Sequence, residues 1–304
     1  MPPAPLWPDH TDVASSDGVT LAAYDLASYD LASTTPADAR PAEPDRDALL
    51  VHANGFCAAV FAPLAAELAP WRCVAFDARA HGRSTPPTGD MAWEGHRDDV
   101  LAVVDAFGLD APVGIGHSMG GAALLLAEQM RPGTFSALWL FEPIVFPPMP
   151  AGTGDSGGDN PLAEGAMRRR DSFDSAGAAY ANFRSKPPLS ELSEACLAAY
   201  VTHGFVPTGE GESVTLRCRP ENEAAGYRMG IRHSAWEHLG DVGCPVVVAR
   251  GSDRVPGPAA VAPAIAQRLG QGCLEEHPEL GHFGPLSDPA SAAASIRALA
   301  NQSG

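Results

Sequence analysis

The chain has 304 residues, of which 45% are hydrophobic and 19% are charged, a composition typical of a folded globular protein that excludes an intrinsically disordered one. The 37 acidic residues outnumber the 20 basic ones and give a formal net charge of −17. A field of this sign repels nucleic acid and anionic lipid, so we expect neither as a partner and expect a small-molecule substrate.

The N-terminal stretch is rich in proline and aspartate, and we expect it to be loose. It lacks the cationic start and apolar run of a signal peptide. No run of about 18 apolar residues that could cross a membrane follows, and we expect a cytoplasmic protein. Asp17-Gly18 indicates a turn, and residues 19–26 have the pattern of a strand.

Short apolar runs alternate with helical segments over residues 48–141 and again from residue 245 onward. Such alternation indicates parallel strands that are buried on both faces. The sequence therefore predicts an α/β fold with a mostly parallel central sheet and helices on both faces. The predicted core strands cover residues 48–52, 73–77, 113–116, 137–141, 245–249 and 272–276.

The alternation stops between residues 147 and 239. Helical pieces at 174–184 and 190–203 occur there, but no strong strand pattern does. We interpret this segment as a helical cap, or lid, inserted into a core formed by residues 1–146 and 240–304. Lids over active sites commonly arise as insertions of this kind on a rigid scaffold.

Residues 116–120 read Gly-His-Ser-Met-Gly and match the G-x-S-x-G nucleophile elbow. The motif stands between an apolar strand and a helix, which is the context it requires. The abrupt turn strains the serine backbone, and the close packing on either side needs glycine. The sequence thus indicates Ser118 as the nucleophile.

A serine hydroxyl needs an adjacent base, and His282 follows the sixth predicted core strand, at the edge where α/β folds place their sites. A carboxylate must orient this base. Asp253 and Glu142 each follow a buried strand. We favour Asp253, since its strand directly precedes the histidine segment, and keep Glu142 as the alternative acid.

An acyl-transfer site also needs N–H donors for the oxyanion. Met119 follows the nucleophile and supplies one, and Asn54, in the loop after the first core strand, supplies the other, with Phe56 as its alternative. The Cys and His residues lack the spacing of a metal site, so we expect no metal and no cofactor. The predicted substrate-binding residues are Phe56, His117, Phe146 and Trp236.

Together these motifs resemble the α/β-hydrolase family. The resemblance rests on HANG at residues 52–55, on the segment 76–84, and on GHSMGG, GSD and GHFGPLSDP. Ala53 and Ala80 depart from it, since each stands where the family usually has glycine. The serine at the elbow argues against the dehalogenases and epoxide hydrolases of this family, which use aspartate there.

The resemblance and the motifs imply a serine hydrolase similar to a carboxylesterase. We expect it to cleave a neutral or weakly polar carboxylic ester through an acyl-enzyme on Ser118. The same triad could act on a lactone, an amide or a carbon–carbon bond, or carry out acyl transfer or perhydrolysis. A catalytically silent ligand-binding receptor on the same fold is the alternative from another class. The sequence favours no particular oligomeric state.

Overall fold

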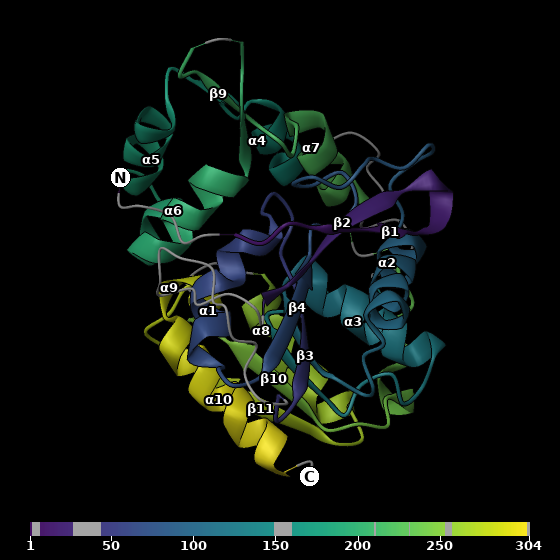
Figure 1. Cartoon of the computed structure of the whole chain (residues 1–304). Helices are drawn as coiled ribbons and strands as arrows, with labels where there is room; N and C mark the ends of the chain where they lie inside the picture. Colours follow the sequence, from purple (N-terminus) through teal and green to yellow (C-terminus); the bar gives the residue numbers. More distant parts are fainter. Residues whose placement is uncertain are drawn as a thin grey trace.

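The computed structural model describes residues 1, 7–26, 44–148, 160–209, 211–230, 232–252 and 257–302. Its centre is an eight-stranded sheet in which β1 and β2 are antiparallel to their neighbours and the other strands run parallel (Figure 1). In sheet order the strands are β1 (Thr11–Ala14), β2 (Thr20–Asp25), β4 (Arg72–Phe76), β3 (Asp47–Val51), β5 (Val113–His117), β6 (Ala137–Phe141), β10 (Val246–Arg250) and β11 (Gly272–Glu276).

The edge strand β1 corrects one expectation. The N-terminal stretch was expected to be loose, but Thr11–Ala14 pairs with β2 through the turn at Asp17 and Gly18. Only Val13 of β1 is buried. A strand of four residues with one inward side chain carries too little alternation to be recognised from sequence.

Alternate side chains of each central strand enter two separate hydrophobic layers. Ala48 and Leu50 of β3 belong to one layer, and Leu49 and Val51 belong to the other. Helices α1 (Ala62–Glu67) and α10 (Pro289–Gln302) cover the first face, and α2 (Trp93–Phe107), α3 (Met119–Met130) and α8 (Pro258–Arg268) cover the second (Figure 1). Short elements complete the core: η1 (Ser16–Gly18), η3 (Ala58–Phe61), η5 (Leu239–Asp241) and α9 (Gly284–Ser287).

Residues 160–232 form an insertion between β6 and β10, and we use this name for them throughout. Within the described residues, its strands form a small antiparallel sheet and none joins the core sheet. This small sheet was not predicted, because strands of two or three residues show no periodicity. The elements are α4 (Pro161–Met167), β7 (Ser172–Phe173), α5 (Ala176–Arg184), η4 (Leu189–Glu191), α6 (Glu194–His203), β8 (Phe205–Pro207), β9 (Val214–Leu216) and α7 (Pro220–Met229).

The insertion contacts the loops that leave the carboxyl ends of the core strands. The Ser193 N–H donates to the carbonyl of Leu286 at 2.9 Å, and the Tyr200 hydroxyl donates to the carbonyl of Gly55 at 3.2 Å. Its helices lie together in the upper part of Figure 1. The carboxyl edge of the sheet, where ligands bind in α/β folds, therefore lies beside the insertion. None of the described helices combines the length and the apolarity needed to cross a bilayer.

Candidate active site

Ser118 occupies the sharp turn between β5 and α3, with φ 54° and ψ −112°. This backbone conformation is strained for a residue with a side chain, and such strain clusters at functional sites. A Cβ atom at Gly116 would lie 2.6 Å from the Cα atom of Gly121, and one at Gly120 would collide with the carbonyl of Val51. The glycines of the motif are thus required by contacts with the helix and with β3.

His282 bridges Ser118 and a buried carboxylate. The Oγ atom of Ser118 lies 3.2 Å from Nε2 of His282, and Nδ1 of the same ring lies 2.5 Å from Oε2 of Glu142. The carboxylate accepts a hydrogen bond from the Nδ1–H group, which keeps the proton on Nδ1 and leaves Nε2 unprotonated and able to take the serine proton. The other carboxylate oxygen, Oε1, accepts the Gly251 N–H at 2.8 Å. Both oxygens of Glu142 are therefore held.

The backbone around Glu142 is built to bring this carboxylate to the imidazole. Glu142 has φ 46°, and its N–H donates to the carbonyl of Ala249 at 2.9 Å. A Cβ atom at Gly251 would lie 2.6 Å from the carbonyl oxygen of Leu280. Glycine at this position therefore lets the loop that carries His282, the histidine loop, approach the end of β10. Asp253, the acid favoured from sequence, lies outside the described residues. The carboxylate that the structure places at His282 is the alternative one.

Two backbone N–H groups are available for an oxyanion. Met119 is the first residue of α3, and the first N–H groups of a helix have no acceptor within it. Within the described residues, the Asn54 N–H meets no acceptor either. The Phe56 N–H, in contrast, donates to the carbonyl of Ala53 at 3.2 Å. These contacts favour Asn54 over Phe56 as the second donor.

Two buried histidines support the segment 52–57, which we call the oxyanion loop. Nε2 of His81 accepts the Gly55 N–H at 2.9 Å, while its Nδ1 donates to the carbonyl of Arg79. Nε2 of His52 accepts the Ala78 N–H at 2.9 Å. Burial lowers the pKa of each of these histidines to about 4, so both rings are neutral near pH 7 and act as acceptors.

The adjacent loop, residues 77–84, is held by two ion pairs of the buried Arg79. Arg79 is fully buried, and its Nε and Nη2 atoms each lie 2.8 Å from an oxygen of Asp99, while Nη1 reaches Asp17 at 2.9 Å. Ala80, one of the two departures from the family pattern, adopts φ 63°, a left-handed conformation that favours glycine. This loop therefore serves to brace the site.

The predicted substrate-binding residues fall in different places. The ring of Phe56 is buried and lies 5.3 Å from the ring of Phe283, which lies beside His282. His117 uses Nε2 to donate to the carbonyl of His282 at 2.8 Å, so it orients the histidine loop. Burial and the neighbouring His282 lower the pKa of His117, and its ring is therefore neutral. Phe146 is half-buried in the segment that leaves β6.

Trp236 was expected to line the substrate pocket, and the structure places it elsewhere. The guanidinium of Arg268, the last residue of α8, lies 4.9 Å above the Trp236 ring. Helix α8 runs back from the carboxyl edge of the sheet, so its C-terminal end lies at the amino edge. Trp236 is therefore remote from Ser118. Its aromatic character alone did not distinguish a pocket residue from one that packs against the core.

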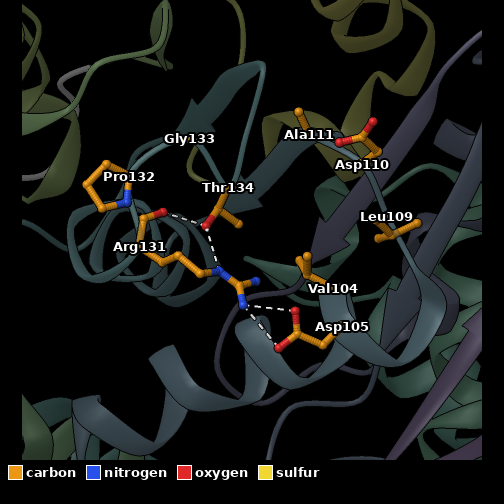
Figure 2. A pocket seen from close by; sticks show the side chains of 9 residues that line it. All are labelled: Val104, Asp105, Leu109, Asp110, Ala111, Arg131, Pro132, Gly133 and Thr134. Carbon is orange, nitrogen blue, oxygen red and sulfur yellow. Dashed lines mark hydrogen bonds and ion pairs between the residues drawn. The ribbon is translucent and has the colours of Figure 1, made fainter.

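The described residues also form a surface pocket of about 200 Å³, and they contain no cluster of three or more potential metal ligands. Figure 2 shows this pocket, which is lined by the C-terminal ends of α2 and α3. Its Arg131 is already bonded to Asp105 at 2.8 Å and to Thr134 at 3.2 Å. Both helix ends lie at the amino edge of the sheet, on the side away from Ser118, so this pocket is not the candidate active site.

A family model described as the alpha/beta hydrolase family matches residues 48–295 of the chain. Among curated proteins, the bifunctional esterase/perhydrolase DCH of Acinetobacter calcoaceticus is 46% identical over 56 residues. That match covers 17% of this chain and spans only 18% of the length of the relative.

Solved structures match over nearly the whole chain. E-2-(acetamidomethylene)succinate hydrolase superposes with a TM-score of 0.74 and 17% identity, covering 96% of this chain and 99% of that one. An esterase from Thermogutta terrifontis gives 0.67 and 19%, with 97% and 99% covered, and esterase RhEst1 from Rhodococcus sp. gives 0.67 and 20%, with 98% and 100% covered. These likenesses show the fold. With the family match over most of the sequence, they establish that this chain belongs to the α/β-hydrolase family.

Proposed function

We propose that this protein is a serine hydrolase that cleaves a neutral or weakly polar carboxylic ester, with Ser118 as nucleophile, His282 as base and Glu142 as acid. The observation that carries the proposal is the continuous line of contacts from Ser118 Oγ to His282 at 3.2 Å and from His282 to Glu142 at 2.5 Å. Nucleophile, base and orienting carboxylate in this geometry form the arrangement that activates a serine hydroxyl.

The reaction follows from these positions. His282 Nε2 takes the hydroxyl proton while Ser118 Oγ attacks the ester carbonyl. The resulting oxyanion accepts hydrogen bonds from the N–H groups of Met119 and Asn54. Glu142 stabilises the imidazolium, which then gives its proton to the departing alkoxide and leaves an acyl group on Ser118. Water attacks this acyl-enzyme, loses a proton to His282, and releases the acid as the serine is restored.

The surroundings of the triad favour an uncharged substrate. Phe56 and Phe283 pack against each other beside His282, and His117 is neutral. We propose that the insertion acts as a cap that covers Ser118 and His282, since it contacts the loops after β3 and β11. The names of the relatives, which include several esterases, agree with this substrate class.

Perhydrolysis is a second candidate activity. The curated relative with 46% identity over 56 residues is named an esterase/perhydrolase. The same acyl-enzyme would form, and hydrogen peroxide instead of water would attack it, so that a peracid leaves and Ser118 regains its proton through His282. Measuring how much peracid and how much free acid form from one ester in the presence of peroxide distinguishes the two.

The test of the proposed function is Ser118→Ala. We expect the folded variant to lose about 10⁴- to 10⁶-fold in turnover of p-nitrophenyl esters, because the nucleophile is absent. Ser136→Ala, at the amino edge of the sheet, is the matched control and should keep wild-type turnover. Assays with esters of increasing chain length, run beside lactones, define the preferred substrate. Near-normal activity of folded Ser118→Ala would exclude the assignment, and a single burst without turnover in the wild type would indicate a receptor.

A further inference from the structure

The oxyanion loop is held from two sides. From the core, His81 accepts the Gly55 N–H at 2.9 Å. From the insertion, the Tyr200 hydroxyl donates to the Gly55 carbonyl at 3.2 Å. The Asn54 side chain donates through Nδ2 to the carbonyl of Glu223 at 2.9 Å. The residue that offers its N–H to the oxyanion is thus fixed through its own side chain and through its neighbour.

Arg169 joins the two insertion residues that reach this loop. Its Nη1 atom lies 2.6 Å from Oε2 of Glu223, and its Nη2 atom donates to the Tyr200 hydroxyl. The side chains of Arg169 and Glu223 are 17% and 10% exposed, so the pair is largely shielded from water. A shielded ion pair with shared hydrogen bonds holds its groups in a defined geometry.

The charge states of these groups suit that role. Burial pulls the pKa of Arg169 down, but Tyr200 and Glu223 more than offset this, and the pKa lies above its ordinary value. Burial raises the pKa of Tyr200 as well, so its hydroxyl stays protonated and donates. The network therefore keeps one arrangement across the neutral pH range.

The contact between the insertion and the loop is also close in a steric sense. A Cβ atom at Gly55, whose φ is 81°, would lie 2.8 Å from Oε1 of Glu223. A Cβ atom at Gly226 of α7 would lie 2.6 Å from Oδ1 of Asn54. Glycine on each side of the interface lets the loop and α7 approach to the distance at which the hydrogen bonds form.

We propose that Tyr200, Glu223 and Arg169 are positioning residues that set the Asn54 N–H in the oxyanion hole. The insertion would then take part in catalysis as well as cover the site. The inference rests on the proposed function, because it assigns these residues a role in that reaction. A displacement of about 1 Å at a catalytic group costs on the order of 10²-fold in rate. Loosening the network should therefore slow catalysis with little change in ground-state binding.

Tyr200→Phe is the principal variant. It keeps the ring contacts with Phe56 and Phe183, at 5.2 and 5.9 Å between centroids, and removes only the hydroxyl. We expect kcat to fall by about 10- to 100-fold with KM nearly unchanged. The control is Tyr180→Phe, which removes a hydroxyl from α5 of the same insertion and should keep the wild-type kcat.

Glu223→Gln tests the ion pair independently and should lower kcat in the same way. Its control is Glu164→Gln, which neutralises the exposed pair between Arg168 and Glu164, where the distance is 3.2 Å and the side chains are 69% and 49% exposed. That variant should leave kcat unchanged. Thermal melts of all four variants establish that they fold, and Tyr200→Phe keeps the proposal testable if Glu223→Gln does not.

A second readout separates positioning from a general structural effect. An aryl trifluoromethyl ketone adds to the nucleophilic serine and leaves its oxyanion in the oxyanion hole, so its inhibition constant should weaken in Tyr200→Phe by about the factor lost in kcat/KM. Unchanged inhibition, or a kcat equal to that of Tyr180→Phe, would overturn the inference. Ser118→Ala is assayed alongside. If Ser118→Ala is inactive while Tyr200→Phe is fully active, this inference alone is rejected. If wild type and Ser118→Ala are equally active, the proposed function is rejected and this inference with it.

Discussion

At the scale of single residues, the contacts of Glu142 identify it as the proposed acid, which its position in the sequence alone did not. Its carboxylate contacts His282 with one oxygen and accepts the Gly251 N–H with the other. Its backbone has φ 46°, a conformation that costs about 1–3 kcal/mol and persists only where the surroundings impose it. Strained backbone of this kind clusters at functional sites, which agrees with the role proposed for Glu142.

We predict that Glu142, and not Asp253, is the acid that orients His282. Glu142→Gln should lower kcat by roughly 10⁴-fold, because an amide cannot neutralise the imidazolium and can select the wrong tautomer. Asp253→Asn should cost far less. Both variants are compared on one ester, with thermal melts to check folding. If Asp253→Asn is the more impaired of two equally folded proteins, Asp253 holds the acid role and the contact at Glu142 is secondary.

At the scale of secondary-structure elements, helix α7 packs closely against the oxyanion loop. Gly226 lies within this helix, and the space where its side chain would stand is taken by Asn54. Gly165 of α4 offers a comparison, since a Cβ atom there would meet nothing within 4 Å. The two glycines share the same low helix propensity and differ in what faces them.

The element-scale prediction is that the two alanine substitutions diverge. Gly165→Ala should raise the free energy of unfolding by up to about 1 kcal/mol, from helix propensity, with kcat unchanged. Gly226→Ala should lower kcat and gain less stability, because the new methyl group displaces the Asn54 side chain. Urea unfolding and ester turnover on both variants provide the measurement. Wild-type kcat in Gly226→Ala would show that the loop tolerates a shift of α7.

At the scale of the whole molecule, buried neutral histidines make stability depend on pH. Burial lowers the pKa of His52 and of His81 to about 4, and it lowers the pKa of His96 and His117 well below the ordinary value. Above pH about 6.5 these rings are neutral in both the folded and the unfolded chain, so they do not affect stability. Below that pH, the unfolded chain binds protons that the folded chain excludes.

We therefore predict that the free energy of unfolding falls as pH drops from about 6.5 toward 4, with His52 and His81 each contributing a loss of up to about 3 kcal/mol. Urea unfolding between pH 7.5 and 5 measures the slope before most carboxylates titrate. The control variant is His238→Gln, which removes a half-exposed histidine. Stability that stays flat over this range would contradict the buried neutral state of these rings.

Local patterns were sufficient to predict the α/β core, and they indicated the proposed nucleophile and base. The elbow around Ser118 joins a strand, a strained turn and a helix within a few residues. The motif, its glycines and its flanking elements can therefore all be recognised in one short stretch of sequence. His282 follows a strand of the alternating pattern, and its place at the carboxyl edge is a property of all parallel strands. The elbow at Ser118 and the place of His282 after a strand both depend on residues that are neighbours in the chain, so they can be recognised from the sequence.

The choice of Glu142 as the proposed acid, and the contacts that hold the oxyanion loop, came from the tertiary structure. Asp253 and Glu142 each follow a buried strand, and only the sheet order shows that β6 lies between β5 and β10, which brings Glu142 next to the elbow. Tyr200 and Glu223 reach the oxyanion loop from 145 and 169 positions away in the chain. Periodicity and backbone sterics were enough to predict the six core strands and the turn at Ser118, because both act between neighbours in the chain. The three-dimensional fold decided which side chains meet, because packing joins residues that have no relation along the chain.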